Sequence, residues 1–223
     1  MDRKSIISSF GLILATGSIW GLVEFGAGMG LQKCATLITG AVLTGISFFW
    51  LSFIWSATRR FLPVILIVGI AMLFKWLDAL LLQVAWNHGS VLNPMFAFFT
   101  AMVGFILLLA VFRNRFAGSL RSRILVGGGA ALLAMCMFPL VKFTSGTPAC
   151  TYAATNIPLS VYTAPVAMVL AMITVPLGFR AASWYYSENR RIHQLETSRV
   201  LYRIWSPAVF MVCVMIMIVV RSI

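Results

Sequence analysis

The chain has 223 residues, of which 61% are hydrophobic and only 10% charged, whereas soluble domains have about 45–50% and about 25%. So few polar residues cannot cover a soluble fold of this size, which excludes a soluble domain and predicts that the apolar excess faces lipid. The formal net charge is +12. The basic residues stand in short segments beside apolar runs, where such residues orient membrane helices. The charge therefore does not indicate a nucleic-acid partner.

Seven apolar runs follow one another with short connections, and a spanning helix needs about 20 such residues. We predict an all-α, polytopic bundle of about seven transmembrane helices, with residues 1–223 as a single domain. The predicted spans are 6–31, 36–57, 61–86, 91–112, 124–143, 160–184 and 204–220. The first is too long for the apolar core of a cleavable signal and is expected to be retained. The last is short and contains Pro207, so six spans are the alternative, and Arg221 just beyond it is expected to snorkel to the interface.

Basic residues alternate strictly from one connection to the next. They lie before the first run and after the second, fourth and sixth: Arg3, Lys4, Arg59, Arg60, Arg113, Arg115, Arg121, Arg123, Arg190, Arg191, Arg199 and Arg203. The other connections hold only Lys33 and Lys142. Because cytoplasmic loops carry the excess of Lys and Arg, we expect the N-terminus inside and Ile223 outside, in a prokaryotic cytoplasmic (inner) membrane.

Three ionisable residues lie inside the apolar runs: Glu24 in the first, and Lys75 and Asp78 in the third. At about 1.5 Å rise per residue, all three fall at a similar depth in the outer half of the membrane. Lys75 and Asp78 are three residues apart and can pair on one helix face. One interpretation is mutual neutralisation, with Glu24 accepting hydrogen bonds from a neighbouring helix. The other is the polar floor of a cavity open to the outside, which binds a zwitterion or cation or relays protons.

Further polar and aromatic residues gather near the predicted outer surface. Asn93 precedes a proline at the start of the fourth run, which is typical of helix capping, and His88 is a lone loop histidine. Trp86, Tyr152 and Tyr162 are placed to stack on a flat ligand or to form an interfacial aromatic belt. The connection at 144–158 is long enough for a lid or binding loop. We count all five residues as candidate ligand contacts.

The four cysteines divide between spans and connections. Cys136 and Cys213 fall within spans, where cysteine acts as a small apolar packing residue. Cys34 and Cys150 both fall in connections assigned to the outside, where an oxidising face favours a disulfide. Free thiols or a thiolate ligand for a soft metal are the alternatives. The sequence contains no histidine and cysteine set with metal-binding spacing, and we expect no cofactor.

Small residues recur at four-residue spacing in the first run, at Gly17, Gly21, Gly26 and Gly30. This spacing lets helices approach closely. Close packing within the chain is the first interpretation, and a contact with another membrane subunit is the second.

Three segments carry a family resemblance: residues 17–24 (GSIWGLVE), 75–78 (KWLD) and 90–94 (SVLNP). In these, the first half of the chain resembles membrane proteins related to the substrate-binding S components of energy-coupling-factor vitamin transporters. The resemblance implies a helical bundle that captures a vitamin-like compound or metal ion from outside. It also implies partners, namely a transmembrane coupling subunit and separate ATPases, since this chain has no GxxxxGK[ST] motif. A seventh span departs from the usual six.

Three functions are therefore considered. The first is a non-enzymatic binding and uptake component for a small molecule, with an outward-facing pocket. The second is a non-catalytic subunit or assembly partner of a larger membrane complex. The third is a thiol or quinone oxidoreductase that uses Cys34 and Cys150, although no nucleophile, base and orienting group occur together.

Overall fold

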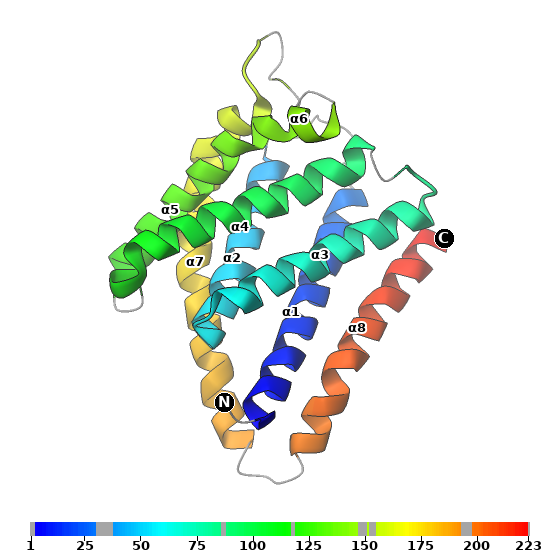
Figure 1. Ribbon diagram of the computed structural model, residues 1–223, viewed down its shortest axis with the longest axis vertical. Helices are drawn as coiled ribbons and strands as arrows, with labels where there is room; N and C mark the ends of the chain where they lie inside the picture. The colour runs from blue at the N-terminus through cyan, green and yellow to red at the C-terminus, as the bar shows by residue number, and fades with distance from the viewer. Residues whose placement is uncertain are drawn as a thin grey trace.

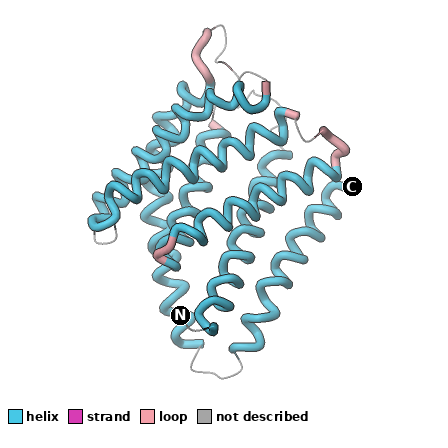
Figure 2. Tube along the Cα trace, viewed as in Figure 1, coloured by secondary structure: helices cyan, strands magenta, loops and turns pink. Residues whose placement is uncertain are grey.

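The computed structural model describes the chain except for residues 1–2, 30–37, 86–87, 117–118, 147–150, 152–154, 193–197 and 223. The described part is helical almost throughout (Figure 2). Its elements are α1 (Arg3–Met29), α2 (Thr39–Thr58), α3 (Phe61–Leu81), α4 (Gly89–Phe116), α5 (Leu120–Met137), the 3-10 helix η1 (Phe138–Val141), α6 (Lys142–Ser145), α7 (Leu159–Ile192) and α8 (Ser198–Ser222).

Seven of the described helices are long and apolar enough to cross a membrane, which confirms the predicted all-α polytopic bundle. The last of them, over Trp205–Ser222, is also long and apolar enough to span, in agreement with seven candidate spans. The third span ends earlier than predicted, and the fifth, which continues to Val141, changes its helix type on the way. The third stops at Leu81 because Gln83 turns the chain with a positive φ of 52°. The fifth tightens into η1 at Phe138, where a proline occupies the first turn.

The helices form two groups that share one contact zone (Figure 1). In one group α7 packs along both α2 and α5, and α4 packs along α5. In the other group α1 packs between α3 and α8. The groups meet where α3 contacts α4 and where α2 contacts α1 and α3. Consequently α8 lies at the edge of the bundle and rests mainly on α1.

Close helix approach is achieved with glycine. Lipid is as apolar as the helix surfaces, so association in a membrane depends on packing and small residues more than on the hydrophobic effect. A Cβ added at Gly127 of α5 would stand 2.6 Å from the carbonyl oxygen of Ala171 in α7, and one at Gly104 of α4 would stand 2.8 Å from that of Ala130 in α5. Neither helix pair could keep its separation with a larger residue.

Aromatic rings fill the middle of the bundle. Trp20 of α1 meets Phe98 of α4 edge to face, with 5.2 Å between ring centroids. Near the predicted cytoplasmic end, Phe116 packs against Phe179 at 4.9 Å. The guanidinium carbon of Arg123 lies 4.3 Å from the centroid of Phe179, and that of Arg59 lies 5.8 Å from it. Two arginines thus stack on aromatic rings where the charge alternation predicts the cytoplasmic headgroup region.

Candidate ligand site at the C-terminal ends of α1, α3 and α8

Glu24 and Lys75 connect α1 to α3. Glu24 accepts a hydrogen bond from the indole Nε1 of Trp20, one helical turn earlier, with Nε1 3.4 Å from Oε1. Lys75 reaches across from α3 and donates to the main-chain carbonyl oxygen of Glu24 at 3.1 Å. A carbonyl oxygen has two lone pairs, so it can accept this bond in addition to its helical one.

Asp78 connects α3 to α8. Its Oδ1 accepts two hydrogen bonds from Arg221, from Nε at 2.9 Å and from Nη2 at 2.8 Å. This differs from the predicted pairing of Asp78 with Lys75. The two residues share a helix face, but Arg221 approaches Asp78 from the neighbouring helix while Lys75 extends toward α1. The expected snorkelling of Arg221 to the interface stays a prediction, and the structure adds Asp78 as the partner of its side chain.

The position of Arg221 follows from the pattern of α8. Phe210, Cys213, Met217 and Arg221 recur every three or four residues and therefore share one face of the helix. The first three pack in an apolar cluster with Phe25 of α1 and Phe74 of α3, and the rings of Phe74 and Phe210 lie 5.8 Å apart. The fourth position brings the guanidinium to Asp78, with its carbon 5.1 Å from the ring centroid of Phe25.

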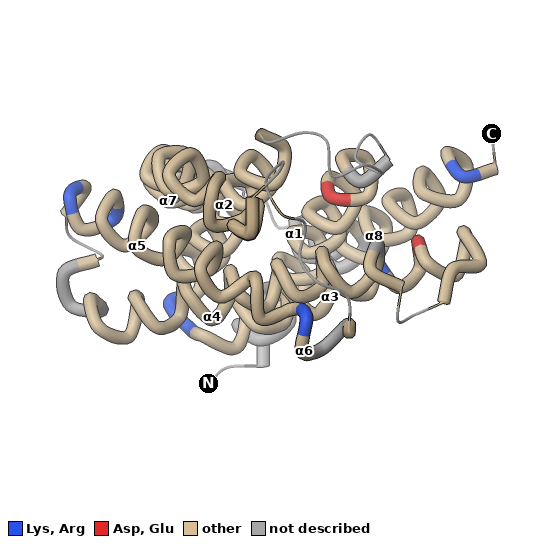
Figure 3. Tube along the Cα trace, turned by 90° about the horizontal axis from the view of Figure 1, so that it is seen from above, with Lys and Arg blue, Asp and Glu red and all other residues tan. Residues whose placement is uncertain are grey.

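These four ionisable residues, Glu24, Lys75, Asp78 and Arg221, are called here the charged cluster. Glu24 is 3% exposed and Lys75 5%, while the side chains of Arg221 and Asp78 are 16% and 13% exposed. Their formal charges cancel, two negative and two positive. The acidic segments coloured in Figure 3 lie in the half of the molecule that holds α1, α3 and α8. The cluster is therefore a neutral, largely buried group whose Asp78–Arg221 end is the more accessible.

Three further predicted contacts lie within the described part of the chain, at the start of α4 and of α7. His88 is exposed and precedes α4, where its carbonyl oxygen accepts hydrogen bonds from the N–H groups of Val91 and Leu92. Asn93 is not the helix cap, because α4 begins at Gly89. Its side-chain Oδ1 is buried and has no hydrogen-bond partner among the residues that the structure describes. Tyr162 lies in the first turn of α7 and is 47% exposed, a position that suits an interfacial belt.

Several predicted residues lie outside the described part of the chain. Trp86 and Tyr152 are among them, so their stacking role stays a prediction. The same holds for the disulfide between Cys34 and Cys150. Within the described residues, Cys136 and Cys213 are free thiols, and no three His, Cys, Asp or Glu side chains come close enough to hold a metal ion.

Arg221 is the member of the site that the sequence did not indicate. In sequence, Arg221 resembles an ordinary interfacial arginine, because it follows Val219 and Val220 at the end of the last apolar run. One signal was present: the predicted orientation puts Arg221 at the same membrane face as the outer-half acids Glu24 and Asp78. Only the packing of α8 on α1 and α3 selects Asp78 as its partner.

The glycines of α1 face two directions. A Cβ at Gly17 would stand 2.7 Å from Cβ of Ile70, and one at Gly21 would stand 2.6 Å from Cγ of Phe74, both in α3. Gly26 has open space around its Cα. The first two glycines thus serve packing within the chain, which was the first interpretation of the small-residue spacing.

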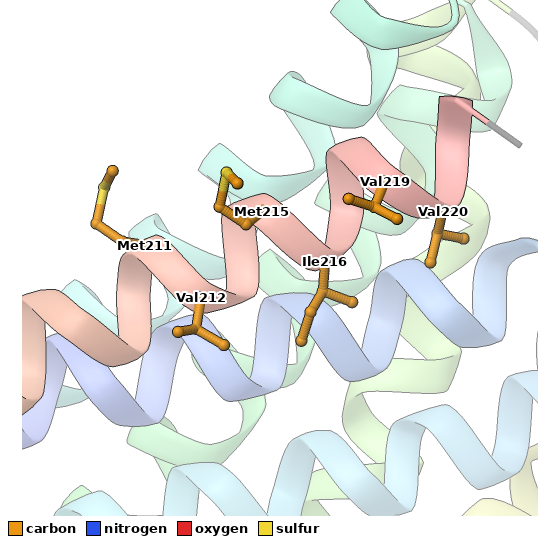
Figure 4. Close-up of a pocket in the computed structure, with 6 residues that line it drawn as sticks. All are labelled: Met211, Val212, Met215, Ile216, Val219 and Val220. Carbon is orange, nitrogen blue, oxygen red and sulfur yellow. The ribbon is translucent and has the colours of Figure 1, made fainter.

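The face of α8 that points away from the bundle is a continuous apolar strip. Six exposed side chains line a shallow depression there: Met211, Val212, Met215, Ile216, Val219 and Val220 (Figure 4). Apolar side chains on the edge helix of a membrane bundle are suited to lipid or to another membrane helix. The same helix therefore presents an apolar surface outward and Arg221 inward.

Comparison with known proteins identifies no relative. No protein-family model matches the chain, and no curated protein or solved structure is significantly similar to it.

Proposed function

We propose that this multi-pass membrane protein is a non-enzymatic binding component of an uptake system, which receives a small polar molecule or ion from the outer side at the charged cluster. The proposal includes a prokaryotic cytoplasmic membrane as the location. One observation carries it: four ionisable residues from three helices meet at one end of an apolar bundle. Ionisable groups inside a membrane are costly and commonly mark the path of a substrate or ion.

The arrangement of the helices supports binding over simple neutralisation. Neutralising Glu24 and Asp78 needs a second base beside Lys75, but it does not require that base to come from the edge of the bundle. The cluster nevertheless draws its fourth member from α8, which rests at the bundle edge. Movement of the outer end of α8 would remove Arg221 and open Asp78 to the outside, without disturbing the contacts between α2 and α7.

The resemblance to S components adds proposed partners. These are a transmembrane coupling subunit and separate ATPases that supply the energy of uptake. Since Gly17 and Gly21 are in contact with α3, a coupling subunit would have to dock elsewhere. The open Gly26 and the apolar strip of α8 are the surfaces proposed for it.

Native mass spectrometry of the protein purified in mild detergent tests this function. We expect a stoichiometric small ligand on the wild type, and its loss from Lys75→Met. Gly69→Ala is the matched control on the same helix, because Gly69 has open space around it and the ligand should stay bound. Retention of the ligand by Lys75→Met would exclude the charged cluster as its site.

A second function is a non-catalytic subunit of a larger membrane complex. It is favoured by the fact that each member of the charged cluster has a hydrogen-bond partner within the chain, together with the apolar strip of α8. In the same mass spectra, this function predicts a ligand-free chain attached to other membrane proteins. Met215→Lys on the strip should release such partners, whereas Gly69→Ala should retain them.

A further inference from the structure

The surroundings of Arg221 resemble a binding site that is already filled. A carboxylate next to an aromatic ring is a common receptor for an ammonium or guanidinium group, because the acid pairs with the charge and the ring face attracts it. Asp78 supplies the carboxylate, and the centroid of Phe25 lies 5.1 Å from the guanidinium carbon. We propose that Asp78 and Phe25 bind a cationic group of the ligand, an ammonium or guanidinium, and that Arg221 occupies this site until the ligand displaces it.

The hydrogen bonds of Arg221 leave room for a competitor. A guanidinium that matches a carboxylate fully uses both oxygens in two parallel bonds. Here Nε and Nη2 both donate to Oδ1, so neither bond uses Oδ2. A cation in solution is not attached to a helix, so it can orient to donate to both carboxylate oxygens of Asp78. Arg221 therefore occupies the site with a less complete set of hydrogen bonds to Asp78 than a ligand cation can make.

Displacement requires only a local change. Arg221 lies in the last turn of α8, and its side chain and that of Asp78 retain 16% and 13% exposure. Met217 and Cys213, one and two turns earlier, anchor the helix in the apolar cluster with Phe25 and Phe74. The outer turn of α8 can move while this anchor stays in place. When Arg221 moves away, the three remaining residues of the charged cluster have a formal net charge of −1. This negative charge favours the binding of a cation.

This inference deepens the proposed function by naming the ligand class, and its test separates the two. Thermal unfolding in detergent is followed with methylguanidinium chloride as the probe, at constant ionic strength set with NaCl. Methylurea, similar in shape and uncharged, is the control. If Arg221 fills the site in 90–99% of molecules, Arg221→Ala should respond to methylguanidinium at concentrations about 10- to 100-fold lower than the wild type.

The partners of the cation define further variants. Asp78→Asn in the Arg221→Ala background should abolish the response to methylguanidinium, and Phe25→Leu should weaken it. Arg221→Lys keeps the positive charge but has fewer hydrogen-bond donors, so it should respond to methylguanidinium at an intermediate concentration. This variant replaces Arg221→Ala in the test if Arg221→Ala does not fold. An equal response of wild type, Arg221→Ala and Arg221→Lys would overturn the proposal. So would a response to methylurea equal to that of methylguanidinium.

The two proposals can fail separately. A ligand found by native mass spectrometry that carries no cationic group would overturn the present inference while the binding function stands. Selective methylguanidinium binding by Arg221→Ala, in a protein that purifies with partner chains and no ligand, would support the cation site and count against uptake.

Discussion

Gly178 of α7 lies directly against Ser52 of α2, so that a Cβ at position 178 would overlap the Ser52 hydroxyl and come within 2.5 Å of the carbonyl oxygen of Phe49. The two helices therefore touch backbone to backbone. Close packing of this kind replaces the hydrophobic effect as the force that joins membrane helices. It makes this crossing a sensitive point of the fold.

We expect Gly178→Ala to destabilise the protein by about 1–3 kcal/mol, the usual cost of forcing extra volume into a packed interior. Thermal unfolding in detergent measures this loss. Gly40→Ala on α2, with open space around its Cα, is the control and should unfold at the wild-type temperature. Equal unfolding temperatures for both variants would mean that α2 and α7 separate easily at this point.

The glycines of α1 give a second prediction. Gly21→Ala should lower the unfolding temperature, because the added methyl meets Cβ and Cγ of Phe74 at 2.7 and 2.6 Å. Phe74 cannot yield freely, since its other contacts include Phe210 of α8. Gly26→Ala on the same helix should be harmless to the isolated chain. The reverse order of stability would place the wrong face of α1 against α3.

Charge balance in the cluster gives a third prediction. Lys75→Met keeps the apolar stem but leaves the cluster with a formal charge of −1, and loss of one buried ionic partner costs about 3–5 kcal/mol. Glu24→Gln added to it restores neutrality. The double variant should therefore be more stable than Lys75→Met alone, which a double-mutant cycle measures. Additive losses in the free energy of unfolding would show that Glu24 and Lys75 do not interact energetically.

The orientation of the bundle can be tested with single cysteines. In a background with all four native cysteines replaced by alanine, His88→Cys should react with a membrane-impermeant thiol reagent applied from outside. Ser119→Cys, in the connection between α4 and α5, should react only after the membrane is opened. The excess of arginine beside that connection is the physical reason. The opposite labelling pattern would invert the topology.

The predicted disulfide gives a fifth test. If Cys34 and Cys150 are bonded, alkylation of the unfolded, unreduced protein should modify only Cys136 and Cys213, which are free thiols. Reduction first should raise the number of modified cysteines to four. Four modifications without reduction would leave Cys34 and Cys150 as thiols.

The spans were predictable from sequence because they depend on a local property. A run of about 20 apolar residues is required by the thickness of the membrane, whatever the neighbours are. The exceptions are also local: a proline ends α5 early, and the turn at Gln83 shortens α3. Neither feature interrupts the apolar run, so hydropathy alone does not predict where these two helices end.

The site was predictable only in part. Glu24, Lys75 and Asp78 stand out because charged residues are rare inside membrane segments. Their partners depend on which helices become neighbours, and sequence spacing carries no such information. Asp78 and Arg221 are separated by 143 residues, and the bond from Lys75 ends on a main-chain oxygen. The lack of a hydrogen-bond partner for Oδ1 of Asn93 within the described ranges likewise follows from where α4 begins.

The ion pair between Asp78 and Arg221 also imposes an order on biogenesis. The ribosome adds about 5–20 residues per second, so the 143 residues added after Asp78 up to and including Arg221 take roughly 7–30 s to synthesise. Asp78 therefore lacks its final partner until α8 has been synthesised. Insertion of the last helix therefore completes the charge balance of the bundle. Until then Lys75, one helical turn away, is the nearest base that can offset the charge of Asp78.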